Sequence, residues 1–145
     1  MKQVKPKLIE GGVFSDHRGR LQFVNDFDMA VVKRMYFTTH PSTETIRAWQ
    51  GHQIESRWFF CVKGAFKVKL VKIDDWENPS NNCKVFEFTL HENKPQVLYI
   101  PNGYANGFKA ETENSKLMIM SNYRLNEIDN DHFRFDKNKW ANWGI

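Results

Sequence analysis

The 145-residue sequence has few of the features that mark secreted, membrane-spanning or nucleic-acid-binding chains. Its two cysteines, Cys61 and Cys83, are too few for a disulfide framework and lack the spacing of a zinc site, so both are expected to be reduced core thiols. No apolar run approaches the roughly 20 residues that a membrane-spanning helix needs; the best stretch is Trp58–Val62. The N-terminal segment has no apolar signal region, which predicts a cytoplasmic protein.

The sequence also has little excess of one sign of charge. Its 21 basic residues are nearly balanced by 17 acidic ones, which gives a formal net charge of +4. No run of lysine and arginine exceeds two residues and no basic helix is evident, which argues against nucleic-acid binding. A small anionic ligand that carries phosphates fits this surface equally well. Nucleic-acid binding stays as a minor alternative, which predicts an affinity for oligonucleotides that falls steeply with salt.

The dominant hydrophobic period is two, which predicts an all-β protein. Residues 65–73 place Phe66, Val68 and Leu70 on one face and lysines on the other, and residues 84–90 repeat the pattern. Further strands are expected at 21–25, 31–38, 45–49, 57–62, 97–100, 106–111 and 116–122. This spacing, with turn-forming breaks, is typical of an antiparallel sandwich or barrel. The length favours a single domain, 1–145, and only the tail after Asn126 has a pattern that allows a short helix.

Two segments place polar residues and glycines inside otherwise apolar strands. In the segment 47–64, alternation puts Gln50 and His52 on the same side of a strand, and Arg57 returns on the next strand after a short turn. In the segment 99–108, Pro101 and Gly103 set a turn, and Asn106 follows three residues after the glycine.

These segments resemble the two motifs of the cupin superfamily. Gln50-x-His52, four residues, Arg57, six residues and Gly64 match the first motif, and Pro101-x-Gly103-x-x-Asn106 matches the second. The resemblance implies an antiparallel jelly-roll β-barrel of the RmlC-like cupin type, with a short helical or irregular C-terminal tail. Of the four slots that hold a metal in metal-binding cupins, only that of His52 has a good ligand. Arg57 puts a permanent positive charge where the cation would sit, so neither a metal nor another cofactor is expected.

The chain further resembles the metal-free cupins that rearrange nucleotide-linked 4-keto sugars, the dTDP-4-dehydrorhamnose 3,5-epimerases and the dTDP-sugar 3,4-ketoisomerases. Residues 16–19 (DHRG) match the Asp-x-Arg-Gly segment of both, and residues 47–50 (RAWQ) stand where both have Arg-Gly-x-His. Residues 101–108 (PNGYANGF) are similar to the epimerase motif Pro-x-Gly-x-Ala-His-Gly-Phe. The segment 121–123 (SNY) and the tail through Arg134 are similar to the ketoisomerases. The likeness spans roughly residues 8–136.

The resemblance implies an isomerase or epimerase that moves a proton next to the ketone of a nucleotide-diphosphate-linked 4-keto-6-deoxy sugar, in deoxysugar or surface polysaccharide biosynthesis. It also implies a homodimer that pairs through swapped N-terminal strands. The histidine that acts as the base in the epimerases is Gln50 here, and an amide cannot accept a proton near neutral pH. His52, two residues on and on the same face, is therefore the expected base.

The remaining roles follow from the same resemblance and from the chemistry of the side chains. Arg57 is expected to stabilise the enolate oxygen, and Tyr123 is expected to be the acid, with Tyr36 and Tyr104 as rivals. Guanidinium groups bind phosphate oxygens in pairs, which makes Arg18 and Arg47 the expected diphosphate clamps. The other expected substrate-binding residues are Gln50, Asn106 and, for stacking on the nucleotide base, Trp49 or Phe23.

Each assignment has a purely structural alternative. His52 can be a hydrogen-bonded strand histidine, Arg57 can simply pair with Glu55, and Tyr123 can belong to the core. Turn chemistry alone accounts for Asn106 and Arg18 in their local sequences. Trp140 and Trp143 are expected to pack the tail onto the barrel or onto a partner subunit. If the structural roles hold, the chain is a non-catalytic cupin that binds a sugar nucleotide or glycan.

Overall fold

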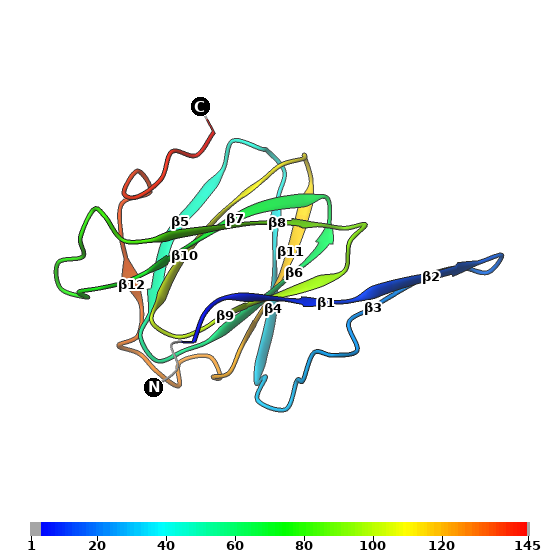
Figure 1. Ribbon diagram of the computed structural model, residues 1–145, viewed down its shortest axis with the longest axis horizontal. Helices are drawn as coiled ribbons and strands as arrows, with labels where there is room; N and C mark the ends of the chain where they lie inside the picture. Colours follow the sequence, from blue (N-terminus) through cyan, green and yellow to red (C-terminus); the bar gives the residue numbers. More distant parts are fainter. Residues whose placement is uncertain (1–3, 145) are drawn as a thin grey trace.

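The computed structural model describes residues 4–144, and this range contains strands and no helix (Figure 1). In chain order the strands are β1 (Lys7–Glu10), β2 (Gly12–Asp16), β3 (Gly19–Phe23), β4 (Arg34–His40), β5 (Ile46–His52), β6 (Arg57–Lys63), β7 (Ala65–Lys72), β8 (Val85–His91), β9 (Gln96–Ile100), β10 (Tyr104–Ala110), β11 (Ser115–Ser121) and β12 (Phe133–Arg134). The predicted all-β fold is confirmed. The described part of the chain accordingly holds no helix of the length and apolarity that crossing a membrane requires.

Two five-stranded antiparallel sheets form the barrel, in the orders β1-β9-β6-β11-β4 and β12-β5-β10-β7-β8. The largest core cluster takes side chains from both sheets, such as Phe59 and Leu117 from the first and Phe66 and Phe108 from the second. Apolar side chains that alternate along each strand therefore meet between the sheets, as in other sandwich-like folds.

The alternation predicted for β7 is confirmed. Phe66, Val68 and Leu70 are fully buried between the sheets, whereas Lys67 and Lys69 lie on the outer face. The neighbouring strand β8 turns Phe86, Phe88 and Leu90 toward the same core. The two cysteines are free thiols, and burial raises the pKa of the core residue Cys61 to about 12.

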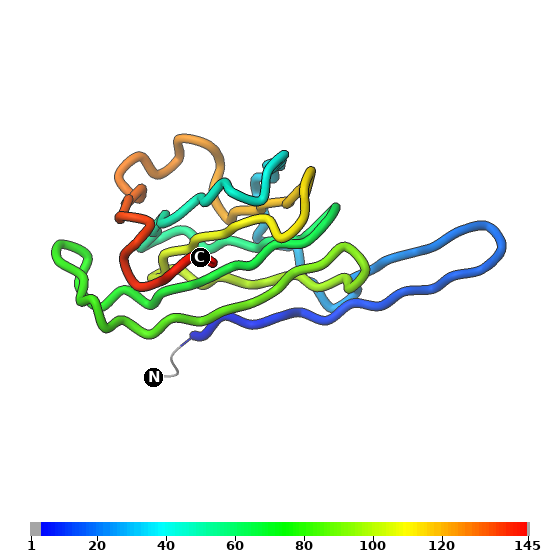
Figure 2. The backbone as a smooth tube through the Cα atoms, turned by 90° about the horizontal axis from the view of Figure 1, so that it is seen from above, coloured from blue at the N-terminus to red at the C-terminus, as the bar shows by residue number. Residues whose placement is uncertain are grey.

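The N-terminal hairpin of β2 and β3 projects away from the barrel in both views (Figures 1 and 2). Only residues 21–25 were predicted as a strand here, because exposed strands carry no burial pattern. Every residue of β3 and nearly all of β2 are exposed. The turn uses Gly19 at a φ of 131°, a conformation that is open to glycine and strained for other residues.

The C-terminal tail forms the two-residue strand β12 beside β5 instead of the helix that its pattern allowed, and is otherwise irregular. Its aromatic residues pack on the outer face of the second sheet, where Trp140 and Trp143 contact Trp49. Gly107 of β10 makes room for this contact, since a Cβ there would lie 2.7 Å from the ring of Trp143. The expected packing of the tail onto the barrel is confirmed.

Replacing Trp49 by alanine tests this tail packing. Trp49 is fully buried and its Nε1 donates a hydrogen bond to the carbonyl oxygen of Lys139. Trp49→Ala is expected to lower the free energy of unfolding by about 3–5 kcal/mol in urea titrations. The control Leu125→Ala removes a side chain that is 65% exposed and should change it by less than about 0.5 kcal/mol. Equal effects of the two substitutions would contradict the packing described here.

Candidate functional site

A polar cavity lies between β4, the edge strand of the first sheet, and β5 of the second sheet, next to the short edge strand β12. Its outer chamber has a volume of about 170 Å³ and its inner chamber about 70 Å³. Both chambers are lined by Tyr36, Gln50 and Arg57, so they lie next to each other. The outer chamber adds Arg34, Glu55, Tyr123, His132 and Arg134; the inner chamber adds Thr38, Arg47 and Asn106.

An irregularity in β5 decides which of its side chains enter this cavity. Asn106 pairs with Gln50, but Phe108 pairs with Arg47, so β5 carries one residue more than β10 over this stretch. Strict alternation would place Arg47 with Trp49 on the outer face. The extra residue turns Arg47 to the cavity, together with Gln50, and leaves Trp49 outside. Trp49 has no exposed surface, so the prediction that it stacks on a nucleotide is wrong.

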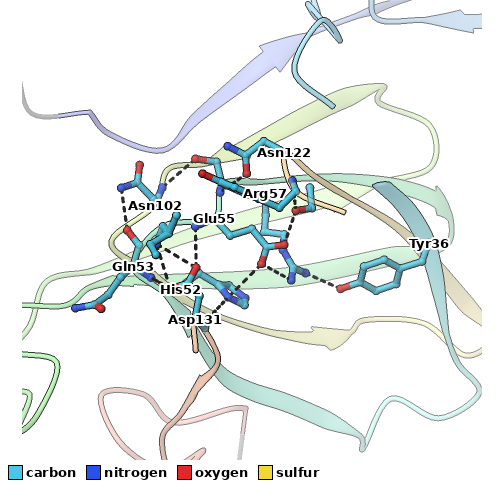
Figure 3. A network of polar contacts seen from close by, with 12 residues as sticks. Tyr36, His52, Gln53, Glu55, Arg57, Asn102, Asn122 and Asp131 are labelled. Carbon is cyan, nitrogen blue, oxygen red and sulfur yellow. Dashed lines mark hydrogen bonds and ion pairs between the residues drawn. The ribbon is translucent and has the colours of Figure 1, made fainter. Parts of the chain in front are cut away.

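The turn between β5 and β6 brings three charged or titratable side chains together (Figure 3). Glu55 Oε2 accepts a hydrogen bond from Arg57 Nη2 at 2.8 Å and lies 3.3 Å from His52 Nδ1, and its other oxygen accepts a bond from Ser121. Arg57 Nη1 also donates to the hydroxyl of Tyr36 at 2.6 Å. The structural alternative for Arg57, pairing with Glu55, is therefore confirmed, and the same guanidinium also lines the cavity.

Burial and charge fix the protonation states in this turn. Burial alone would raise the pKa of Glu55, but hydrogen bonds from Arg57 and Ser121 outweigh it and hold that pKa below its ordinary value. Burial lowers the pKa of His52, and the charge of Arg57 lowers it further against the opposing effects of Asp131 and Glu55. At neutral pH the cluster thus consists of an ion pair beside an uncharged imidazole.

The tautomer of His52 follows from its hydrogen bond. Its Nδ1 lies 2.8 Å from the carbonyl oxygen of Asp131, which can only accept, so Nδ1 carries the proton. The other nitrogen, Nε2, is buried and has no hydrogen-bond partner among residues 4–144. His52 lies behind the cavity wall that Glu55 and His132 form, and its ring is 5.7 Å from that of His132. An imidazole of this kind has a free lone pair to accept a proton.

Several arginines of the cavity have no acidic partner. In the described part of the chain Arg47 and Arg134 form no ion pair, and Arg34 lies over the ring of Tyr36 with 4.5 Å between guanidinium carbon and ring centroid. Clustered guanidinium groups that have no acidic partner favour an anionic ligand, above all phosphate.

Three residues that were predicted to bind the substrate do not line the cavity of their own chain. Arg18 is at the tip of the projecting hairpin, where it pairs with Asp16 at 2.7 Å, and Phe23 is exposed on β3. Tyr104 is buried in the core against Phe86 and lines neither chamber. The prediction for Tyr104 is wrong, and neither hairpin residue reaches the cavity of its own chain.

The remaining predicted residues come together at the cavity: Tyr36, Arg47, Gln50, Arg57, Asn106 and Tyr123 line it, and His52 lies next to it. Asn106 is part of β10 and points inward, so turn chemistry does not explain it. Sequence reasoning missed Arg34, His132 and Arg134. Arg34 shares the inward face of β4 with Tyr36 and could have been found from that alternation, whereas His132 and Arg134 depend on the return of the tail to β5.

His52, Glu55 and Asp131 also offer ligand atoms within 4.8 Å of one another, a spacing that suits a metal ion. Their donor atoms are engaged, however, since the Asp131 carboxylate accepts three backbone N–H groups and Glu55 holds Arg57 and Ser121. A cation at this place would also lie beside the guanidinium of Arg57. The residues therefore fit a hydrogen-bonded cluster better than a metal centre.

The buried histidines make stability depend on pH. Burial, with the charge of Arg47, lowers the pKa of His40, as burial and Arg57 do for His52, whereas both titrate near 6.5 in the unfolded chain. The unfolded chain then binds more protons. The stability that the two uncharged histidines contribute is therefore present above pH 6.5 and is lost as the pH drops toward their folded pKa values.

His40→Leu tests this contribution, because it removes a ring packed between Phe66 and Phe108. The variant should show a smaller decrease in the free energy of unfolding between pH 7.5 and 5.5 in urea titrations. The exposed control His91→Leu should leave the slope unchanged, and an unaltered slope in His40→Leu would contradict the assignment.

Comparisons with known proteins show the fold and the family of this chain. A probable low-salt glycan biosynthesis epimerase, Agl13 of Haloferax volcanii, is 31% identical over 125 residues, which are 81% of this chain and 75% of the relative. The structure of a dTDP-4-dehydrorhamnose 3,5-epimerase from Bacillus anthracis, with TDP and PPi bound, superposes with a TM-score of 0.78 at 16% identity and covers 97% of this chain and 85% of the other.

A mutant of the 3,4-ketoisomerase QdtA from Thermoanaerobacterium thermosaccharolyticum, in complex with TDP-4-keto-6-deoxyglucose, has a TM-score of 0.69 at 21% identity over 92% of this chain and 90% of the other. These likenesses confirm the RmlC-like cupin fold, and the relatives are of the kind expected, sugar epimerases and isomerases. The family model described as "FdtA: WxcM-like, C-terminal" matches residues 4–140. The chain thus belongs to the FdtA/WxcM-like C-terminal family.

Proposed function

We propose that this protein is a metal-independent isomerase or epimerase of a nucleotide-diphosphate-linked 4-keto-6-deoxy sugar. The observation that carries the proposal is one cavity in which the guanidinium of Arg57 and the hydroxyl of Tyr36 are hydrogen-bonded, next to the uncharged imidazole of His52. The ligands in the related structures, TDP and TDP-4-keto-6-deoxyglucose, support a dTDP-linked substrate.

The size of the cavity suits the sugar ring alone. Its chambers, about 170 and 70 Å³, are below the roughly 300–1,000 Å³ of pockets that enclose drug-sized ligands. The nucleotide then lies outside, and its diphosphate contacts Arg34 and Arg134 of the outer chamber together with Arg47, an exposed residue that lines the inner chamber. This arrangement keeps the expected role of Arg47 and adds two residues to the clamp.

The chemistry requires a base, a group that stabilises an enolate oxygen, and an acid on the return path. His52 stays the expected base, since the lone pair of its Nε2 is free and its Nδ1 is fixed by a carbonyl oxygen, but its ring lies behind the wall of the cavity and lines neither chamber. Arg57, which stays charged at every relevant pH, faces the oxygen that gains negative charge. His132 is the rival base because it lines the cavity itself.

Two tyrosines compete for the role of the acid. Tyr123 lines the outer chamber, whereas Tyr36 lines both chambers and accepts a hydrogen bond from Arg57. Since the guanidinium occupies a lone pair of the Tyr36 oxygen, the O–H of Tyr36 remains available to donate. Arg57 also stabilises the phenolate that forms after donation, so the geometry favours Tyr36 over Tyr123.

Incubation with dTDP-4-keto-6-deoxyglucose in deuterated water tests the proposal. The wild-type protein should incorporate deuterium next to the ketone, at C3 or C5, as measured by NMR and mass spectrometry. His52→Asn should lower the rate of exchange by about 10²–10⁴-fold, the usual contribution of a positioned base, and Tyr36→Phe should impair the reaction more than Tyr123→Phe.

The matched control is His91→Asn, which changes an exposed histidine at the end of β8 and should leave exchange intact. A larger loss in His132→Asn than in His52→Asn would assign the base to His132. Binding of the nucleotide sugar without deuterium uptake, with several nucleotides tried, would contradict catalysis and favour the non-catalytic binding module.

The projecting hairpin supports a homodimer as the working assembly. Phe14 and Leu21 are cross-strand partners on β2 and β3 and are 53% and 65% exposed, which leaves an apolar face uncovered in the single chain. We infer that a second copy covers this face through swapped N-terminal strands, the pairing that the resemblance implies. The cytoplasmic location and the role in polysaccharide biosynthesis stay predictions.

Analytical ultracentrifugation checks the homodimer. The wild-type protein is expected to sediment as a dimer, and Leu21→Asp should shift it toward the monomer because a charge would be buried in the interface. Leu125→Asp, an equally exposed leucine of the loop after β11, should leave the dimer intact. A monomeric wild-type protein at micromolar concentration would refute the pairing.

A further inference from the structure

Asp131 is a buried carboxylate without a lysine or arginine partner among residues 4–144. It is 1% exposed, and it reaches the turn between β5 and β6 from the C-terminal tail. Its Oδ1 accepts the backbone N–H of Gln53 at 2.6 Å, both oxygens lie 3.1 Å from the N–H of Ile54, and Oδ2 accepts the N–H of Glu55 at 2.8 Å (Figure 3). Burial of a charge is costly unless hydrogen bonds compensate it. The bonds from the turn therefore hold this carboxylate in place, and the carboxylate in turn fixes the backbone of residues 53–55.

The turn that Asp131 holds carries the site. His52 is the last residue of β5, Glu55 lies within the turn, and Arg57 opens β6. The carbonyl oxygen of Asp131 also accepts the hydrogen bond from His52 Nδ1. One tail residue therefore binds four consecutive residues, 52–55, and sets both the path of the backbone and the tautomer of the imidazole.

The carboxylate of Asp131 also affects the charge balance around His52. Glu55 and Asp131 are the acidic groups near the ring and Arg57 is the basic one; His132 packs edge-on and Tyr104 is the strand partner on β10. With one cation and two anions nearby, a proton on Nε2 would be attracted to the excess negative charge. The charges of Glu55 and Asp131 both oppose the lowering of the pKa of His52, as does the hydrogen bond to the backbone carbonyl of Asp131, which has the larger effect.

We propose that Asp131 is a positioning residue, which clamps the β5–β6 turn through three backbone N–H groups and provides the negative charge that stabilises protonated His52. This inference rests on the proposed function for its catalytic consequence. The clamp itself is a property of the folded chain and is measured without substrate.

Hydrogen exchange of the wild-type protein tests the clamp. The amides of residues 53–55 lie outside the strands, yet their protons are bonded to a buried carboxylate and should exchange as slowly as those of neighbouring strands. Fast exchange at all three amides would overturn the clamp. No variant is needed, so a failure to fold cannot obscure the result.

Asp131→Asn tests the charge, because it keeps the size of the side chain and removes the negative charge, although it also replaces one of the two acceptor oxygens by an NH2 donor. In NMR titrations of the wild-type and variant proteins, the pKa of His52 should fall further below its ordinary value. A substitution that merely loosened the turn would hydrate the imidazole and move its pKa up toward the ordinary value, which would overturn the proposed role. The control Asp129→Asn, at an exposed position of the same segment, should leave the titration unchanged.

Measurement of kcat and KM for Asp131→Asn separates this inference from the proposed function. The kcat for deuterium exchange should fall roughly 10–100-fold in Asp131→Asn, the range expected when hydrogen bonds to a charged group are lost, with a smaller change in KM. An inactive wild-type protein with slow amides at 53–55 and the predicted His52 titration would refute the function and leave the clamp in place. An active wild-type protein with an unaffected Asp131→Asn variant would refute the positioning role.

Discussion

The buried ion pair of Arg57 and Glu55 is the interaction on which the site depends. Both side chains are nearly inaccessible to solvent, and the guanidinium reaches Glu55 on one side and the Tyr36 hydroxyl on the other. A buried pair of this kind is weak evidence for stability, because desolvation offsets the attraction, and removal of one partner typically costs about 3–5 kcal/mol. Its value here is that a fixed positive charge points into a small cavity, where a developing negative charge is attracted more strongly than in water.

The surrounding architecture explains how such a charge is held in place. The extra residue in β5 turns Arg47 inward, and β4 contributes Tyr36 from the opposite sheet. The tail then returns to β5, where β12 continues the sheet and its aromatic residues cover the outer face. Two layers thus support the same strand, with the candidate site residues on its inner side and the packed tryptophans on its outer side.

Most strands of the barrel and several residues of the cavity could be predicted from the sequence. Period-two alternation located the strands whose inner faces are buried, and motif spacing identified Gln50, His52, Arg57 and Asn106.

The errors in the predictions have physical causes. A strand exposed on both faces has no burial pattern, so β2 was missed. The extra residue in β5 turns Arg47 inward, whereas Trp49 keeps its outward direction and is covered by the returning tail. Tyr104 has the same inward direction as Asn106, but its place along the strand puts it in the core. Asp131 and His132 reach the site only because a segment distant in the sequence returns to β5, which no local pattern reveals.

A crystal structure of the protein soaked with dTDP tests the central claim most directly, that the opening between β4 and β5 binds a nucleotide diphosphate in front of the buried ion pair. The account predicts density for the diphosphate in contact with Arg47 and with Arg34 or Arg134, and space for a sugar ring beside Tyr36 and Arg57. A nucleotide bound elsewhere, such as at the lysines on the outer face of β7, would contradict it, as would an empty opening at a dTDP concentration that saturates the protein in solution.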